Sequence, residues 1–182
     1  MSLPNGEVTV QVPVTQPRLR FNVRTPSAVA AVRGTKFRVA SDAETTGSKS
    51  EVLEGVVGFG GDQNEVVLEK GFASKVAQVG AELLPPVALL SAPEWNRSCN
   101  DPGYAAWSEP AGATQYKLVL LENDTQLDKV ISEVMVASSE YTFTDIDDGC
   151  YQLRVSAIDD NGFNGNETQR EFCYTAPELE MP

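Results

Sequence analysis

Apolar and polar residues alternate in short runs along the whole chain. Val8, Val10 and Val12 are separated by polar residues, and the same alternation returns at 21–24. A period of two residues is typical of strands that bury one face. No segment keeps a helical period of 3.6 residues over three turns, and the one ambiguous run, 28–32, has room for a single helical turn. Glycines between the runs indicate tight turns, so the pattern predicts an all-β protein.

Prolines suggest where the chain divides. Pro85, Pro86 and Pro93 surround four apolar residues, and such a segment is stiff and extended. We therefore expect a first domain, a short proline-rich linker with restricted motion, a second domain and a tail. Their predicted ranges are 1–86, 87–93, 94–177 and 178–182.

Charge separates the same two halves. Residues 1–90 hold equal numbers of basic and acidic residues, so the whole formal net charge of −12 belongs to residues 91–182. An acidic surface repels phosphate backbones, and we expect no nucleic-acid partner. No apolar run is long enough to span a membrane, and the first residues lack the pattern of an export signal. If the protein is exported, that signal is expected to lie outside this sequence.

Two segments of the first half carry a recognisable pattern. TPSAVAAVRGTKFRV at 25–39 predicts a strand, a tight turn and a second strand, and EVLEGVV follows at 51–57. Together they resemble the FecR domain of bacterial envelope proteins, over roughly residues 6–86. The resemblance implies a β-sandwich or a short solenoid-like stack of strands. It also gives a signature that we interpret as structural: Thr25, Pro26, Arg33, Gly34, Thr35, Phe37 and Gly55.

FecR domains usually contain further strands before the segment that here begins at Gly6. The resemblance therefore implies a sheet with an unpaired edge, and such edges invite another strand. A homodimer that depends on where the chain begins is the expected consequence.

The second half resembles a fibronectin type III domain. Residues 104–120 are similar to its B and C strands, and residues 141–159 to its E and F strands. The resemblance implies an immunoglobulin-like β-sandwich in which Tyr151 is the corner tyrosine. The side chains expected in its core are Trp107, Tyr116, Leu118, Tyr151, Leu153 and Val155.

The same strand map implies a disulfide between Cys150 and Cys173, which would face outward on adjacent strands. Cys99 is the alternative partner, and an odd number of cysteines leaves one thiol unpaired. A disulfide fits an exported protein better than a cytosolic one.

Catalytic patterns are missing. The sequence has no histidine, which excludes Ser-His-Asp and Cys-His relays and most zinc sites. Gly58-Phe59-Gly60-Gly61 lacks the spacing of a dinucleotide fingerprint and is interpreted as a hairpin turn. Oxygen-bearing residues at 159–167 could hold calcium, but a tight turn explains them better. We therefore expect no enzyme activity, cofactor or metal.

Two functional hypotheses remain. The first is a non-enzymatic binding module of the bacterial periplasm or cell envelope, whose partner is an envelope protein or peptidoglycan. This follows from the occurrence of FecR domains beside LysM segments and immunoglobulin-like repeats. The alternative is the periplasmic signal-receiving part of a FecR-type sigma-factor regulator in iron-uptake signalling. The fibronectin-like half favours the first hypothesis at this stage.

Overall fold

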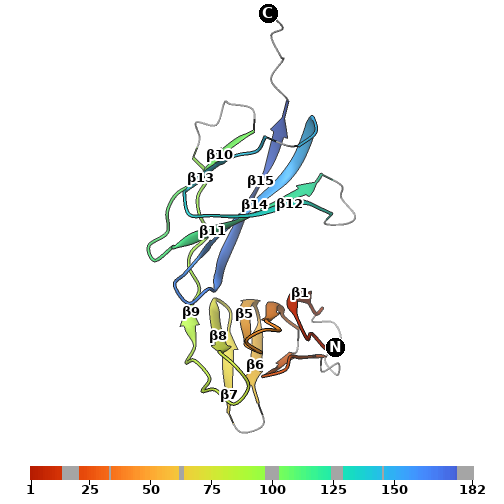
Figure 1. Cartoon of the computed structure of the whole chain (residues 1–182), viewed down its shortest axis with the longest axis vertical. Coiled ribbons are helices and arrows are strands. Elements are labelled where there is room, and N and C mark those ends of the chain that lie inside the picture. The colour runs from red at the N-terminus through yellow and green to blue at the C-terminus, as the bar shows by residue number, and fades with distance from the viewer. Residues whose placement is uncertain are drawn as a thin grey trace, which may run out of the picture. The chain divides into compact units, whose positions relative to one another are not determined.

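The computed structural model describes residues 1–13, 21–32, 34–61, 64–96, 103–123, 129–144 and 146–175. Within these ranges every regular element is a β-strand, as the alternation predicts (Figure 1). This part of the chain accordingly contains no helix suited to crossing a membrane. The fold is all-β, and the chain forms two compact units, Met1–Leu89 and Leu90–Pro182.

The first unit is built from two antiparallel sheets. One sheet has the strand order β1-β4-β5-β8-β9, and the other has the order β2-β3-β6-β7. The strands are β1 (Gly6–Gln11), β2 (Phe21–Arg24), β3 (Val29–Val32), β4 (Lys36–Ser41), β5 (Ser48–Glu54), β6 (Val56–Gly60), β7 (Glu65–Glu69), β8 (Phe72–Val76) and β9 (Val87–Ala88).

The core of the first unit lies between these sheets. Each strand turns its alternate apolar side chains inward, so both sheets contribute to one buried cluster. Its fully buried members are Val23, Phe37, Val39, Val52, Val57, Phe59 and Leu68. The unit is therefore a β-sandwich, in which the chain changes sheet after β1 and then after each pair of strands up to β8.

The structure corrects three local interpretations in this unit. The ambiguous run 28–32 contributes strand β3 and no helical turn, since its valines are held in an antiparallel sheet. Strands β3 and β4 do not pair with each other, because the chain crosses between sheets at Gly34. Gly58 and Gly60 lie within β6, and the turn that follows joins Gly61 N to Asn64 O at 3.0 Å.

The first residues of the chain cover the β2 edge of the sheet β2-β3-β6-β7. The backbone of Met1 and Leu3 runs along β2: Met1 N donates to Asn22 O, and Leu3 N donates to Arg24 O. Strand β1 is the edge of the other sheet. The segment expected as a linker also contains structure, because its residues 87–88 pair with β8 as strand β9.

The second unit also has two antiparallel sheets. A two-stranded sheet pairs β10 with β13, and a four-stranded sheet has the order β12-β11-β14-β15. The strands are β10 (Tyr104–Ala106), β11 (Gln115–Glu122), β12 (Val130–Val136), β13 (Glu140–Thr142), β14 (Gly149–Ile158) and β15 (Asn164–Tyr174).

All six side chains predicted for the core of the second unit are buried. They form one cluster with residues of the smaller sheet, such as Ala105, and with Phe143 beside it. Trp107 packs edge-on against Trp95 and Tyr116, with ring centroids 6.2 Å and 5.4 Å away. The predicted core is therefore confirmed, and the unit is a β-sandwich.

Candidate functional site

The first part of the FecR-like signature forms the β2–β3 turn. Thr25 N donates to Ala28 O at 2.9 Å, and Pro26 occupies the position where its fixed φ suits a turn. The Thr25 hydroxyl accepts hydrogen bonds from Ala28 N at 3.0 Å and from Ser48 Oγ at 2.7 Å. Ser48 belongs to β5 in the other sheet, so Thr25 ties the two sheets together.

The second part of the signature brings two chain crossings together. Gly34 and Gly55 have φ angles of 66° and 80°, which favour glycine. A Cβ on Gly55 would lie 2.6 Å from Thr35 Cγ2 and 2.8 Å from Gly34 O. Phe37 follows as a fully buried core residue. These residues have structural positions, and Arg33 lies outside the described residues.

A shallow hollow of about 470 Å³ lies on the outer face of sheet β2-β3-β6-β7. Its floor is made of small side chains, since Ala31 on β3 pairs with Gly58 on β6, and Val29 pairs with Gly60. Both glycines also allow close contacts: a Cβ on Gly58 would collide with the Glu65 carboxylate, and one on Gly60 with Asn64 O. The hollow therefore depends on these small residues.

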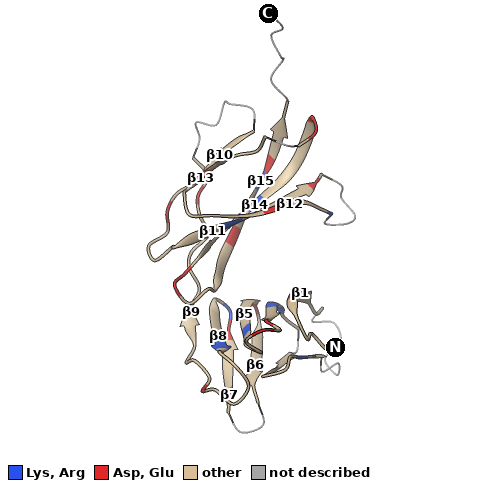
Figure 2. Cartoon of the chain, viewed as in Figure 1, with Lys and Arg blue, Asp and Glu red and all other residues tan. Residues whose placement is uncertain are grey.

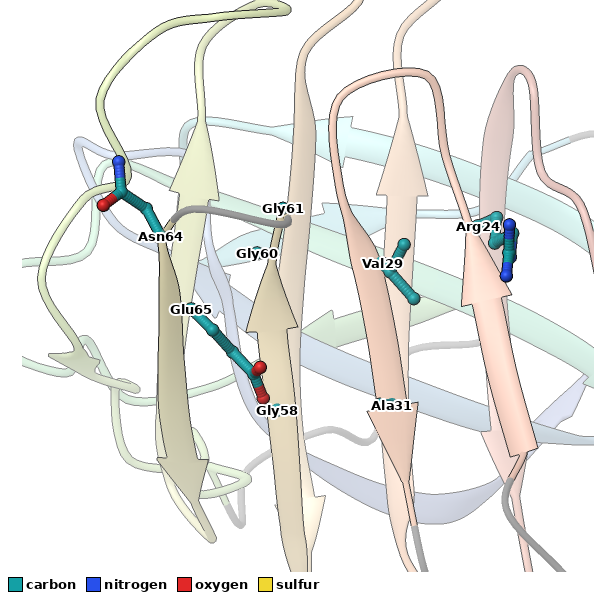
Figure 3. A pocket seen from close by; sticks show the side chains of 8 residues that line it. All are labelled: Arg24, Val29, Ala31, Gly58, Gly60, Gly61, Asn64 and Glu65. Atoms are coloured by element: carbon teal, nitrogen blue, oxygen red, sulfur yellow. The ribbon is translucent and has the colours of Figure 1, made fainter.

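Opposite charges flank the hollow (Figure 3). Arg24 lies on β2 at one side, and Glu65 lies on β7 at the other. The register places them in one row across the four strands, with Val29 and Gly60 between them. Figure 3 shows the Glu65 side chain extending across β6 towards Gly58. A ligand would therefore meet small residues on the floor, with a guanidinium at one side and a carboxylate that reaches over Gly58 from the other.

This geometry is suited to binding. Among the described residues, the lining of the hollow includes no serine, threonine, cysteine or lysine that could act as a nucleophile. A floor of small residues with separated charges at its sides can instead hold a segment of complementary shape and charge. Sequence reasoning missed the site because Ala31, Gly58 and Gly60 come from strands whose pairing the sequence does not reveal.

A second hollow, of about 480 Å³, lies in the second unit. Its lining includes Tyr151, whose hydroxyl donates to Asp147 O at 2.7 Å, and the ion pair of Lys129 with Glu122 at 2.8 Å. The hydrogen bond to Glu122 raises the pKa of Lys129. Tyr151 closes the corner before β14, and its role is explained by the stability of the sandwich.

The cysteines and the acidic loop of the second unit have distinct positions. A disulfide joins Cys150 on β14 to Cys173 on β15, whereas Cys99 lies outside the described residues. Asp159 Oδ1 accepts a hydrogen bond from Phe163 N at 2.8 Å, and Gly162 N donates to Asp159 O at 3.0 Å. The Asp159 carboxylate therefore stabilises a tight turn, in line with the interpretation favoured for this loop.

Comparisons with known proteins cover only part of the chain. No curated protein matches it significantly. Two solved structures of proteins from Parabacteroides distasonis ATCC 8503, each described as a "putative anti-sigma factor", are similar to 46% and 47% of the chain. Their sequence identities are 24% and 21%, and their TM-scores are 0.42 and 0.36. The matched regions span 38% and 49% of those two chains.

A family comparison gives a more specific result. The model of the family described as FecR protein matches residues 1–58. This range includes the β2–β3 turn, both chain crossings and the β2 and β3 strands of the hollow face. Over these residues, the chain is similar to FecR proteins.

Proposed function

We propose that this chain is the periplasmic signal-receiving part of a FecR-type sigma-factor regulator, and that its first unit binds a protein partner on the hollow face. The carrying observation is that the FecR match covers strands that build this face. The signature residues Thr25, Gly34 and Gly55 fix the turns that hold the two sheets in place. The FecR resemblance thus accounts for the scaffold, and the hollow supplies the binding surface.

The regulator is preferred over a wall-binding module. The match to the FecR family supports a signal-receiving unit directly. The wall-binding hypothesis depends instead on the company that FecR domains keep, namely LysM segments and immunoglobulin-like repeats, and no comparison finds a LysM segment in this chain. The hollow suits a protein segment because its floor is made of small residues and its charged flanks, Arg24 and Glu65, have opposite signs. Peptidoglycan therefore remains an outcome to be tested.

The proposed protein has no enzymatic role. The sequence contains no histidine, and the lining of the hollow provides no nucleophile with an adjacent base. The proposed location is the periplasm or cell envelope, where the disulfide between Cys150 and Cys173 would persist. The proposed partner is the periplasmic segment of an outer-membrane receptor.

The second unit is proposed to be a fibronectin type III-like repeat. Three observations support this: the facing sheets, the inward aromatic residues, and the hydrogen bond from the Tyr151 hydroxyl to a backbone oxygen four residues upstream. We propose that this repeat supports the first unit and binds no partner through its own hollow. The side chains that line that hollow, such as Tyr151, are explained by their contribution to folding.

The proposal can be tested by filling the hollow. Ala31 is exposed on the floor, so Ala31→Arg adds bulk and charge without entering the core. Thr9→Arg on β1 is the matched control, because Thr9 is exposed in the other sheet of the same unit. In the bacterium that encodes the chain, transcription driven by the cognate sigma factor is measured after the inducing ligand is added. Co-sedimentation with purified peptidoglycan is measured in parallel.

We expect Ala31→Arg to lower induction at least about tenfold, which corresponds to a loss of about 1.4 kcal/mol in binding. Thr9→Arg should respond like the unmodified protein, and circular dichroism should show both variants folded. Equal induction in both variants would exclude the hollow as the signalling surface. Co-sedimentation that Ala31→Arg abolishes would instead favour the wall-binding function.

A further inference from the structure

Among the strands that the structure describes, the sandwich of the first unit has one position unfilled. Five strands in the order β1-β4-β5-β8-β9 face four in the order β2-β3-β6-β7. Strand β7 contacts β5 and β8 of the opposite sheet, so the place opposite β9 lies beyond β7. Within the described ranges, β7 pairs with β6 alone, and no other backbone hydrogen bond reaches it. Its outer edge therefore offers backbone donors and acceptors to a further strand.

The other edge of the same sheet is already occupied. Met1 N donates to Asn22 O at 2.9 Å, and Leu3 N donates to Arg24 O at 2.8 Å. The first residues of the chain thus lie along β2. A partner strand that extends this sheet must therefore pair with β7.

The outward side chains of β7 indicate which strand would fit beside it. Glu65, Val67 and Glu69 alternate along β7 and are exposed, Val67 to 63%, whereas Leu68 between them is buried in the core. Val67 lies opposite Gly58 in the register, so this exposed row borders the hollow (Figure 3). Residues that lie directly opposite each other on paired strands share a face, and opposite charges are favourable there. The complementary strand carries a basic, an apolar and a basic side chain at alternate positions.

The inner side of the unfilled position is apolar. Phe72 shares a face of β8 with Val76, which belongs to the core cluster. Phe72 is nevertheless 38% exposed, and Ala88, its partner on β9, is also exposed. A strand added beside β7 would cover these two residues with the side chains of its own inner face. Those side chains are therefore expected to be apolar.

We propose that the protein partner adds an extended segment to β7, with a basic residue, three apolar residues and a second basic residue in sequence. Its basic residues lie opposite Glu65 and Glu69, its central residue lies opposite Val67, and the two between them face Phe72 and Ala88. Main-chain hydrogen bonds supply affinity in this mode of recognition, and the alternate side chains supply specificity. The inference rests on the proposed function, because the segment is taken to belong to the partner that binds the hollow face.

Two synthetic peptides test this mode of binding. One contains Lys-Ile-Val-Ile-Lys and the other Glu-Ile-Val-Ile-Glu, and both have glycine at each end and blocked termini. Each peptide is added to the full chain, and backbone amide hydrogen exchange is followed by NMR spectroscopy. We expect one lysine peptide to bind per chain and to slow exchange of the β7 amides. Strand β1 is the internal control, because it is also a sheet edge, and its exchange should not change.

Charge reversal at Glu69 tests the predicted register. Glu69→Lys should weaken binding of the lysine peptide by about fivefold or more, and the variant should prefer the glutamate peptide. Glu7→Lys is the matched control, because Glu7 is exposed on the edge strand β1 of the other sheet. It should leave both affinities unchanged, and circular dichroism should show both variants folded.

Unprotected β7 amides, equal protection of β1, or equal effects of the two variants would overturn the inference. The induction assay used for Ala31→Arg separates this result from the proposed function. Loss of induction in Ala31→Arg but not in Glu69→Lys would contradict strand addition and leave the proposed signalling surface in place. Protection of β7 by the lysine peptide, with normal induction in both variants, would support strand addition and contradict the proposed function.

Discussion

At the residue scale, the backbone conformation of Gly55 and the hydroxyl groups of Thr25 and Tyr151 account for much of the scaffold. The sequence pattern singled out Gly55 and Tyr151, and the structure supplies the physical reason for each. Gly55 has a positive φ and lies against Thr35, while Tyr151 donates to the backbone at Asp147. The sequence could not predict that Gly55 contacts Thr35 or that Tyr151 contacts Asp147. These contacts depend on how the chain folds back on itself where it changes sheet and where it turns into β14.

Gly55→Ala should strongly destabilise the first unit. The added Cβ meets both an unfavourable φ of 80° and close contacts with Thr35 and Gly34, so we expect a loss of more than about 3 kcal/mol. Gly71→Ala is the control, since Gly71 has a φ of 84° but no atom within 4 Å of the added Cβ. That variant should lose only about 1 kcal/mol. If urea unfolding gave the same loss of stability for Gly55→Ala and Gly71→Ala, the contacts of Gly55 with Thr35 and Gly34 would not contribute to stability.

Tyr151→Phe tests the corner of the second unit. The variant keeps the ring but removes the hydroxyl that donates to Asp147 O at 2.7 Å, and we expect a loss of about 1–1.5 kcal/mol. Tyr104→Phe is the comparison, because the Tyr104 hydroxyl contacts Glu140 at the exposed surface. Thermal unfolding of both variants measures the difference, and a larger loss for Tyr104→Phe would contradict the assignment.

At the element scale, strand positions were easier to predict than strand partners. Alternation located most of β1 and β2, whereas the resemblance to fibronectin type III domains located β14 and the core of the second unit. The two-residue strand β9 and the assignment of β3 and β4 to different sheets were missed. Pairing between distant segments determines both features, and a local period carries no information about it. The hollow face was missed for the same reason.

A buried ion pair joins β4 to β5 on the outer side of their sheet. Glu51 is 1% exposed and lies 2.6 Å from Arg38 on β4 and 3.0 Å from Lys49 on its own strand. Glu51→Gln keeps the size of the side chain and removes its charge, so we expect a loss of roughly 3 kcal/mol.

Glu133→Gln provides the matched control for Glu51→Gln. The Glu133 carboxylate lies 3.0 Å from Lys117 but is half exposed, and its loss should cost less than about 1 kcal/mol. Urea unfolding at low and high salt measures both variants. Similar losses would show that burial does not strengthen the pair at Glu51.

Strand β12 is an edge of its sheet and exposes several apolar side chains. Val130, Ile131 and Met135 are 53%, 40% and 50% exposed. Such an edge favours aggregation, and a lysine there counteracts strand addition. Met135→Lys should therefore reduce light scattering at high concentration while changing the thermal midpoint little. Unchanged scattering would show that β12 is not the aggregating edge.

At the scale of the whole molecule, charge and compactness divide the chain in a similar place. Acidic residues are spread over the strands of the second unit, whereas β5 and β8 of the first carry lysines (Figure 2). Lys49 and Lys75 are paired in the register of these two strands. The boundary between the two compact units falls between Leu89 and Leu90 in the sequence. Each unit has its own buried cluster, so we propose that each folds independently.

The fragment 90–182 should fold by itself as a monomer. It contains the complete cluster around Trp107 and the disulfide between Cys150 and Cys173. Calorimetry should give one cooperative transition that moves to lower temperature on reduction, by the equivalent of about 3 kcal/mol. Analytical ultracentrifugation checks the mass. A disordered fragment would contradict the division into two units.

The proposed function requires that the hollow face of sheet β2-β3-β6-β7 receives a protein partner. A photo-crosslinking amino acid placed at Ala31, with the same substitution at Thr9 as control, tests it directly in living cells. We expect a single crosslinked product from position 31, which mass spectrometry should identify as the periplasmic segment of an outer-membrane receptor, and no such product from position 9. No product from position 31, or the same product from both positions, would contradict it.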